Sequence, residues 1–388
     1  MTNELRNVPD LRFPGFEGEW EESNIDNEFD FFNNKRKPIK ENLRNKGEYP
    51  YYGATGIIDY VDDFIFDGNF ILIGEDGANI VSRSAPLVYF ATGKFWVNNH
   101  AHILYPKFGD IYFNYLLLEN IDYEKYNTGT AQPKLNVQNL KKIKIKSPRD
   151  NSEQQKIGKF FSKLDRQIEL EEQKLAKLEE QKKGYMQKLF SQELRFKDDK
   201  RNEYPEWEEK KLGDILERGN KDKVNEIGKY RRLTISLHGK GLYEVKQERK
   251  TKDTRPFYQR FEGELIIGKQ NFFNGSIAIV TSEFNGFICS NAIMSYKISN
   301  HMNRKYLLEY LLQNDFLRKN EYLADGTGQK ELSEKKFEEL EIKLPNSINE
   351  QQKIGVFLER LDNLIEKQSN KLELLKKRKQ GFLQKMFV

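Results

Sequence analysis

Two stretches rich in Lys and Arg, one in each half of the chain, have the residue types that bind anions. Six basic residues between Lys35 and Lys46 accompany one acid, Glu41, and twelve between Arg218 and Arg255 accompany five acids. Lys and Arg position a protein on DNA through phosphate oxygens, whereas Asn, Gln and Arg read base edges. For each residue alone, a solvated basic surface is the better explanation. Two such stretches in corresponding places favour DNA contact.

The candidate DNA-contacting residues are basic and amide side chains from these stretches and from the loops that follow them. They are Lys35, Arg36, Lys37, Lys40, Arg44, Arg83, Asn98, Asn99, Lys134, Arg218, Lys221, Lys223, Arg231, Arg232, Lys269, Gln270, Asn271 and Lys330. Tyrosines interleave with the charge at Tyr51, Tyr52, Tyr230, Tyr243 and Tyr258. Two Gly-Thr-x-Gln loops, 129–132 and 326–329, are either anion-holding turns or tight connections.

Motifs for covalent chemistry are missing. No Asn/Asp-Pro-Pro-Tyr/Phe run is present, so the usual catalytic loop of an amino-methyltransferase is absent. The segment Gly263–Gln270 has the spacing of a phosphate-binding loop, but Gln270 stands where that loop has a Ser or Thr for magnesium. His100 and His102 suit a metal pair or one face of a strand, and no further ligand pattern accompanies them. We expect no metal site, no cofactor and no enzymatic activity on this chain.

The elements that must position the candidate residues occur twice. Glu153-Gln-Gln-Lys-Ile-Gly158 returns as Glu350-Gln-Gln-Lys-Ile-Gly355, an offset of 197 (350 − 153). Of the 38 residues from Glu153 to Phe190, 19 are identical in the second copy. A repeat of this length indicates a duplicated domain rather than a solenoid unit. A duplicated chain presents two similar faces, so it suits a ligand with two similar halves. The two halves of the chain differ most at 24–66 and 211–261.

Each half contains a globular part followed by a long charged helix, which predicts an α+β fold. The predicted segments are domain 1–148, helix 149–192, linker 193–203, domain 204–346 and helix 347–388. Each long helix opens with a capping-box pattern, Ser152 or Asn349 followed by Gln three residues later. Short apolar runs predict strands at 70–73, 87–90, 265–267 and 277–280, and spaced Leu and Tyr predict helices at 111–118 and 305–312.

Both long helices carry an apolar stripe in steps of four and three, the heptad pattern of a coiled coil. The seam residues, including the polar ones that interrupt the stripe, are Leu164, Ile168, Glu171, Leu175, Leu178, Lys182, Leu361, Ile365, Gln368, Leu372, Leu375 and Lys379. We expect antiparallel pairing with partner numbers summing to 550, so that Glu171 meets Lys379 and Lys182 meets Gln368. This pairing gives pseudo-two-fold symmetry and a spacer of roughly 42 Å between the domains. Alternatively, each stripe packs on its own domain.

Composition favours a cytoplasmic protein. The chain has 388 residues, of which 32% are charged, with net charge +5. Its single cysteine, Cys289, excludes an internal disulfide and favours a reducing compartment. No apolar run approaches the ~18 residues of a membrane span, and the N-terminal residues lack a hydrophobic signal core. We therefore expect no membrane partner.

The order of these features resembles the specificity subunit of type I restriction–modification systems. The features of the first half are, in order, Phe13-Pro-x-Phe16 before Trp20, a variable globular part, Gly-Thr-x-Gln, and Glu-Gln-Gln-Lys-Ile-Gly at the start of a heptad helix. The second half repeats this order. The resemblance implies two target-recognition domains that each read one half of a bipartite double-stranded DNA sequence, with a coiled coil fixing the spacer. It also implies two methyltransferase subunits using S-adenosylmethionine and two restriction subunits using ATP and Mg2+. Catalysis then belongs to those partners.

Exposed helix residues are candidates for methyltransferase docking, or form a plain solvated flank. They are Lys174, Lys177, Glu180, Lys371 and Lys376. Two other functions remain open: a non-catalytic scaffold with two protein-binding heads, and a subunit of a related system in which one partner chain carries both nuclease and methyltransferase. A methyltransferase gene beside this one favours the DNA-reading function over the scaffold.

Overall fold

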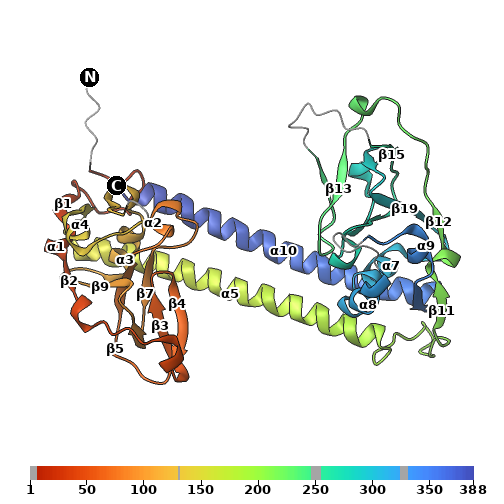
Figure 1. The fold of residues 1–388 in the computed structure, drawn as a ribbon. Coiled ribbons are helices and arrows are strands. Elements are labelled where there is room, and N and C mark those ends of the chain that lie inside the picture. The colour runs from red at the N-terminus through yellow and green to blue at the C-terminus, as the bar shows by residue number, and fades with distance from the viewer. Residues whose placement is uncertain (1–6, 130–131, 246–254, 324–330) are drawn as a thin grey trace. The chain divides into compact units, whose positions relative to one another are not determined.

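The chain divides into two compact α+β units (Figure 1). The computed structural model describes residues 7–129, 132–245, 255–323 and 331–388. The first unit comprises Met1–Lys174 with Ser369–Val388, and the second comprises Leu175–Gln368. Each unit therefore contains one globular domain and one end of each long helix. Within the described ranges, no helix is both long and apolar enough to cross a membrane.

The domain of the first unit contains the strands and helices predicted at 70–73, 87–90 and 111–118, which form β6, β7 and α3. Its main elements in chain order are β1 (Glu21–Asn24), α1 (Ile25–Glu28), β2 (Phe29–Phe31), β3 (Lys46–Gly53), β4 (Gly56–Val61), β5 (Phe66–Asp67), β6 (Phe70–Gly74), α2 (Asn79–Ser82), β7 (Val88–Ala91), β8 (Lys94–Val97), β9 (Ala101–Pro106), α3 (Ile111–Glu119), α4 (Val137–Lys142) and β10 (Lys144–Ser147).

The candidate residues of the first domain lie in the segments that connect its strands, beside one antiparallel sheet. Its strand order is β2-β9-β6-β7, and a second sheet has the order β4-β3-β8-β5. Buried side chains of the first sheet and of α3 share one core with Trp20. The chain leaves β6 at Gly74, which lies opposite Ala101 of β9. Directly after it, the backbone carbonyl of Glu75 accepts a hydrogen bond from the N–H of Leu135, which brings three loops together.

The second unit repeats this scaffold, and the predicted strands at 265–267 and 277–280 and the predicted helix at 305–312 form β16, β17 and α7. Its main elements are β11 (Glu208–Lys211), α6 (Leu212–Ile215), β12 (Leu216–Arg218), β13 (Leu233–Ile235), β14 (Leu242–Glu244), β15 (Phe257–Gln259), β16 (Leu265–Gly268), β17 (Ile277–Ile279), β18 (Ile288–Ser290), β19 (Ile293–Ile298), α7 (Arg304–Leu311), α8 (Asn314–Lys319), α9 (Glu334–Glu338) and β20 (Glu341–Leu344).

Sheet topology separates the shared scaffold from the variable part. The sheet β12-β19-β16-β17 repeats the order β2-β9-β6-β7, and the pair β11-β20 repeats β1-β10. Where the first unit has β4-β3-β8-β5, the second has the separate pairs β13-β14 and β15-β18. These strands belong mainly to the segments in which the two halves of the sequence diverge. The duplication therefore preserved one sheet and changed the strands beside it.

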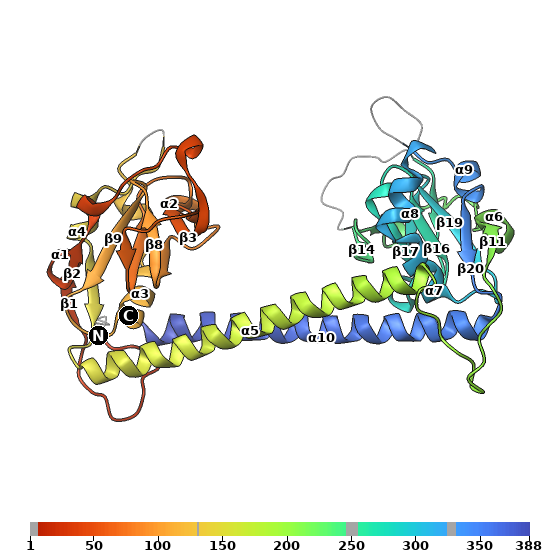
Figure 2. The same cartoon turned by 90° about the horizontal axis from the view of Figure 1, so that it is seen from below.

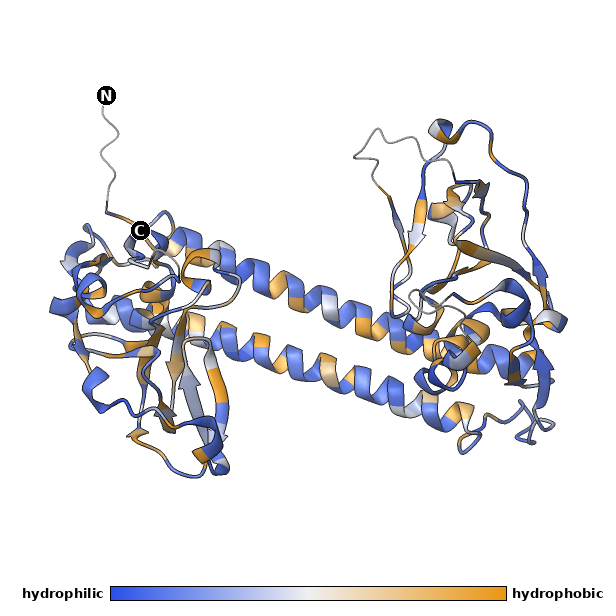
Figure 3. Ribbon diagram, viewed as in Figure 1, coloured by the Kyte–Doolittle hydropathy of each residue, from blue (hydrophilic) through white to orange (hydrophobic). Residues whose placement is uncertain are grey.

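The long helices are α5 (Asn151–Phe190) and α10 (Ile348–Met386), close to their predicted bounds. Within each unit their ends run antiparallel (Figures 1 and 2). Phe160 packs edge-to-face on Phe382 in the first unit, and Tyr185 packs on Phe357 in the second. Apolar residues recur along both helices (Figure 3), and all twelve predicted seam residues are buried or half-buried.

The predicted helix register is wrong. Lys182 pairs with Asp362 at 2.6 Å rather than with Gln368, and Glu171 pairs with Lys371. Partner numbers therefore sum to 544 (182 + 362) or 542 (171 + 371) instead of 550. The apolar stripe is compatible with both registers, because a shift of almost one heptad still places apolar residues opposite apolar residues. The charged pairs distinguish the two.

The repeated Glu-Gln-Gln-Lys-Ile-Gly motif attaches each helix to its own domain. Glu153 is 1% exposed, and its two carboxylate oxygens accept from Nε and Nη2 of Arg12 at 2.7 and 2.8 Å. Gln154 Nε2 donates to the carbonyl of Pro148 at 2.8 Å, and Gln154 Oε1 accepts from the backbone N–H of Asp110 at 3.2 Å. These charge-assisted and amide contacts fix the angle at which α5 leaves the domain.

The second copy of the motif makes the same contacts. Glu350 is fully buried and pairs with Arg195, and Gln351 Nε2 donates to the carbonyl of Pro345 at 2.9 Å. The predicted capping boxes at Ser152 and Asn349 are wrong, because α5 already begins at Asn151 and α10 at Ile348, so both residues lie inside their helices. Gln155 and Gln352, which would complete the boxes, are exposed, and Asp150 Oδ1 accepts from the backbone N–H of Ser152.

Candidate nucleic-acid interface

In the first domain, predicted basic residues surround the carboxylate of Glu75, directly after β6. The guanidinium of Arg36 donates to Glu75 Oε2 at 2.7 Å and to the carbonyl of Ala101 at 3.0 Å. Lys134 Nζ lies 3.5 Å from Glu75 Oε1. Burial acts to raise the pKa of Glu75, but the hydrogen bond from Arg36 and the nearby positive charges hold this pKa below its ordinary value. The carboxylate therefore neutralises a site that the sequence presents as basic.

His102 is buried in β9, and both of its ring nitrogens have partners inside the domain. Nε2 lies 2.7 Å from the carbonyl oxygen of Leu135, and Nδ1 lies 2.9 Å from Nδ2 of Asn33. The backbone N–H of Ile103 donates to Asn33 Oδ1, which fixes the orientation of that amide. His102 Nε2 is therefore the donor and Nδ1 the acceptor. Burial lowers the pKa of His102, which keeps the ring neutral.

Three other predicted residues of the first domain are also occupied or enclosed. Arg44 pairs with Asp59 at 3.2 Å, and Arg83 donates to Glu119 Oε1 at 2.9 Å. Asn98 is buried. DNA contact by the exposed members of the candidate set stays a prediction, and those members are Lys35, Lys37, Lys40, Asn99 and Lys134.

In the second domain, two predicted basic residues pair with acids of α9. Nε and Nη2 of Arg218 donate to the two carboxylate oxygens of Glu338 at 2.6 and 2.8 Å. This hydrogen bonding lowers the pKa of Glu338. Lys221 Nζ lies 2.5 Å from Glu334 Oε2, and Arg218 lies 3.5 Å from the same oxygen. Arg218 is therefore held by two carboxylates and Lys221 by one.

The remaining predicted residues of the second domain lie elsewhere. Arg231 pairs with Glu244, and the guanidinium of Arg232 lies 4.5 Å from the ring centroid of Phe257. Lys223, Gln270 and Asn271 are exposed. Lys330 and the whole second Gly-Thr-x-Gln loop lie outside the described residues, as does the middle of the first loop.

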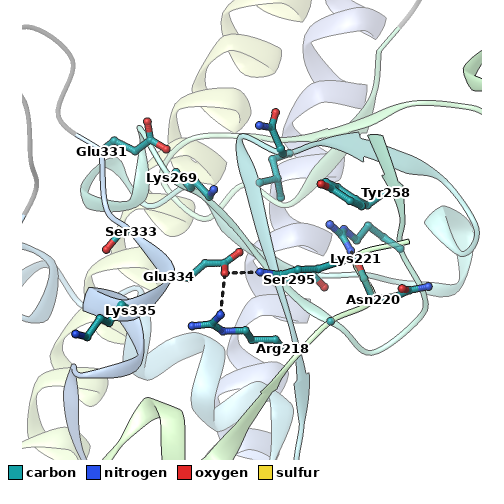
Figure 4. Close-up of a pocket in the computed structure, with 14 residues that line it drawn as sticks. Arg218, Asn220, Lys221, Tyr258, Lys269, Ser295, Glu331, Ser333, Glu334 and Lys335 are labelled. Carbon is teal, nitrogen blue, oxygen red and sulfur yellow. Dashed lines mark hydrogen bonds and ion pairs between the residues drawn. The ribbon is translucent and has the colours of Figure 1, made fainter. Parts of the chain in front are cut away.

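A cavity of about 830 Å³ in the second domain brings three predicted residues together (Figure 4). Arg218 ends β12, Lys221 follows it, and Lys269 follows β16. Arg260 and Ser295, which are 3% and 8% exposed, also line the cavity. Five basic and two acidic residues line it in total, so its charge favours an anion as ligand. Its other polar lining residues include Asn220, Tyr258, Asn291, Glu331, Ser333 and Lys335.

Sequence reasoning identified Tyr258 as a neighbour of the basic stretch but missed Arg260 and Ser295. The Arg260 guanidinium donates to the carbonyl of Asn220 at 2.9 Å and to Sγ of Cys289 at 3.2 Å. Burial raises the pKa of the Cys289 thiol. No local pattern marks a buried arginine whose partners lie 40 and 29 residues away. The fold therefore brings these polar side chains to the cavity, and no sequence motif marks them.

Fold and site together define a duplicated two-domain protein with partly neutralised basic residues in both domains and a basic cavity in the second. Among the described residues, no group of three His, Cys, Asp or Glu side chains is arranged to hold a metal ion. The model of the type I restriction modification DNA specificity domain matches residues 17–180 and 204–376, and the chain belongs to this family.

Individual relatives agree with the family. The chain is 38% identical over 135 residues to a protein of Haemophilus influenzae assigned as a type I restriction enzyme specificity subunit, a match that spans 34% of either chain. It is 23% identical over 395 residues to the type I restriction enzyme MjaVIII specificity subunit of Methanocaldococcus jannaschii, covering 94% of this chain and 91% of that one. The crystal structure of a type I restriction–modification S subunit from M. genitalium shares the fold, with a TM-score of 0.69 at 18% identity and coverage of 98% and 99%.

Proposed function

We propose that this chain is the specificity subunit of a type I restriction–modification complex, in which each globular domain reads one half of a bipartite DNA target. The observation that carries the proposal is the double family match on a duplicated sheet whose neighbouring strands differ between the domains. A shared scaffold with unlike strands and loops suits two unlike half-sites. The exposed candidate residues then divide into phosphate contacts from Lys and Arg and base contacts from Asn and Gln.

In this proposal, α5 and α10 set the number of base pairs between the half-sites. An α-helix rises about 1.5 Å per residue, so one heptad adds roughly 10 Å, the length of about three base pairs. Their apolar seam and the charged pairs beside it hold the two helices in register. The length of the paired helices thus determines the number of base pairs between the two half-sites.

We further propose that catalysis belongs to partner subunits. Two methyltransferase subunits that use S-adenosylmethionine dock on the helices, and two restriction subunits that use ATP and Mg2+ complete the nuclease. Candidate docking residues on the helix flanks are Lys174, Lys177, Glu180, Lys371 and Lys376. Of these, Lys371 and Lys376 pair with Glu171 and Glu172 across the helices.

Methylation mapping tests the reading function. A host that lacks adenine methylation receives this gene with the methyltransferase gene of its system, and a second host receives the methyltransferase gene alone. We expect one bipartite methylated sequence in the first host only. Absence of sequence-specific methylation, with both proteins expressed and associated, would support the protein-binding scaffold instead.

Heptad insertion tests the spacer. Seven residues of matching pattern are inserted after Lys174 in α5 and after Gln368 in α10, so that both helices lengthen equally. Methylation mapping should then show both half-sites unchanged and a spacer longer by about three base pairs. A change in the half-site sequences would contradict the assignment of reading to the domains and spacing to the helices.

A further inference from the structure

Two equivalent backbone hydrogen bonds, one in each domain, show which residues correspond. The N–H of Leu135 donates to the carbonyl of Glu75 at 2.8 Å, and the N–H of Leu332 donates to the carbonyl of Lys269 at 3.0 Å. Glu75 and Lys269 each follow the last glycine of an equivalent strand, β6 or β16. Lys269 therefore occupies the place of Glu75. By the same correspondence, Glu331 occupies the place of Lys134.

The charges at these two places are reversed between the domains. In the first domain Glu75 is the central carboxylate, and Arg36 and Lys134 neutralise it. In the second domain the central residue is Lys269, which is half-buried and, within the part of the chain that the structure describes, has no carboxylate within 4 Å. Glu331 is exposed and lines the edge of the cavity. The second domain thus presents a positive charge where the first presents an internally paired negative one.

Small residues open the cavity above this position. The N–H of Phe32 donates to the carbonyl of Ile103, and the N–H of Gly219 donates to the carbonyl of Ser295, so Gly219 and Ser295 replace two bulky apolar residues. In the first domain the ring of Phe32 packs on Phe70 with centroids 5.5 Å apart and fills the space. A Cβ on Gly219 would lie 2.4 Å from Ser295 Oγ, so no larger residue fits there.

Polar groups replace the aromatic pair beneath the cavity. Strand registers place Glu264 at the position of Phe70, because Ile71 lies opposite Leu104 and Leu265 lies opposite Tyr296. Glu264 is 4% exposed and accepts from Ser295 Oγ at 2.8 Å. The second domain therefore has a polar, water-compatible cavity where the first has a packed core.

Of the cations that line the cavity, Lys269 and Lys221 are the candidates to hold an external anion, because Lys335, although exposed, extends away from the other labelled lining residues (Figure 4). Arg260 is buried, and Arg218 is held in a bidentate pair by Glu338. Lys221 is half-exposed, and among the described residues Glu334 is the one carboxylate within 4 Å of its Nζ. A backbone phosphate can take the place of one carboxylate on a lysine, because both carry one negative charge on two acceptor oxygens and both form charge-assisted hydrogen bonds with an ammonium group.

We propose that this cavity binds one backbone phosphate of the DNA through Lys269 and Lys221, that Glu334 competes with the phosphate for Lys221, and that the first domain has no corresponding phosphate site. The proposal rests on the proposed DNA-reading function and adds an asymmetry to it. The second domain then has a phosphate contact whose strength depends on salt. At the same place in the first domain, the basic residues form ion pairs within the domain.

Salt dependence of DNA binding by the full chain tests the phosphate site. The probe is a fluorescent duplex of random sequence, about 30 base pairs long, titrated between about 0.05 and 0.5 M KCl. Each lost phosphate contact should reduce the slope of log affinity against log salt by about 0.9, which corresponds to about an eightfold weaker affinity at 0.1 M salt. We expect the full reduction when Lys269→Ala and Lys221→Ala are combined, and part of it for each single variant, because both lysines contact the same phosphate. Lys211→Ala is the matched control, because Lys211 is an exposed lysine of β11 outside the cavity.

Glu334→Gln tests the competition. The neutral amide releases Lys221, so duplex affinity should increase several-fold at 0.1 M salt, and adding Lys221→Ala should remove the gain. Circular dichroism checks that every variant folds. Unchanged slopes for both lysine variants, equal to that of Lys211→Ala, would overturn the proposal, and so would a loss of affinity in Glu334→Gln.

Two further outcomes separate this proposal from others. If the unmodified chain binds no duplex and directs no methylation, the proposed function itself fails. The second outcome is that Lys269→Ala binds the duplex with the same salt dependence as the unmodified chain, whereas inorganic phosphate binds the unmodified chain saturably and does not bind Lys269→Ala. In that case the cavity binds a free anion, and the assignment to a DNA phosphate is overturned.

Discussion

At Gly158, α5 passes so close to the first domain that a side chain has no room. A Cβ at this position would lie 2.1 Å from Oδ1 of Asp110, the oxygen that caps the N-terminus of α3. Gly355 repeats the arrangement, with its Cβ position 2.5 Å from Oδ1 of Asn303, which caps α7. Gly184 lies six residues before the end of α5, and no described atom outside the helix backbone lies within 4 Å of its Cβ position.

This difference predicts opposite effects for the same substitution in the same helix. We expect Gly158→Ala to lower the free energy of unfolding by about 1–3 kcal/mol, because the added methyl displaces the capping carboxylate. Gly184→Ala should raise it by up to about 1 kcal/mol, because alanine favours the helix and meets no neighbour. Urea unfolding of the full chain, followed by circular dichroism, measures both. Stabilisation by Gly158→Ala would show that the motif glycine is not needed for close packing.

Charge at single residues was predictable from the sequence, but the partners of those charges were not. Arg36 was predicted as a DNA contact, and its strongest partner, Glu75, lies 39 residues away. Arg218 finds Glu338 at a separation of 120 residues. The fold brings these carboxylates to the arginines through strand pairing, and no local pattern encodes that. Candidate sites chosen by charge alone therefore include structural arginines as well as accessible ones.

At the scale of elements, periodicity predicted the long helices and the central strands, because an apolar repeat of 3.5 or of two residues is a local property. The helix register was not predictable in this way. Lys379 pairs with Asp165, and Lys182 pairs with Asp362. These pairs are equivalent at the offset of 197 that relates the two halves, a relation that the apolar stripe alone does not reveal.

Lysines three residues apart on α10 test which charged pairs fix the register. Lys379 and Asp165 are each about one quarter exposed, and the hydroxyl of Tyr112 also donates to Asp165. We expect Lys379→Ala to lower the free energy of unfolding by about 1–3 kcal/mol, because a half-buried carboxylate loses its cation. Lys376, which pairs with Glu172 at the surface, is the control. Lys376→Ala should have no measurable effect in thermal unfolding, because exposed pairs contribute little. Equal losses of stability in Lys379→Ala and Lys376→Ala would show that the pair of Lys379 with Asp165 does not fix the helix register.

At the scale of the whole molecule, each unit combines segments that are far apart in the sequence. In the second unit the chain continues from α5 into the next domain, and the N–H of Leu194 donates to the carbonyl of Lys188 at 2.9 Å. In the first unit the same contact joins the two ends of the chain, since the N–H of Leu11 donates to the carbonyl of Lys385 at 2.8 Å. The segment after position 368 thus completes a domain that begins near the N-terminus.

Because each unit contains the end of one long helix from the other half of the sequence, we can predict which domain loses stability when a helix end is mutated. Phe387 packs on Trp20 and Phe113 in the first unit, whereas its equivalent Phe190 packs on Tyr306 in the second. Replacing a buried Phe by Ala typically costs about 3–5 kcal/mol. In hydrogen exchange of the full chain, we therefore expect Phe387→Ala to lower the protection of α3 and to leave α7 unchanged. Phe190→Ala should do the reverse. If Phe387→Ala exposed α7 and spared α3, the C-terminal segment would belong to the domain that precedes it in sequence, and the two units would have to be redrawn.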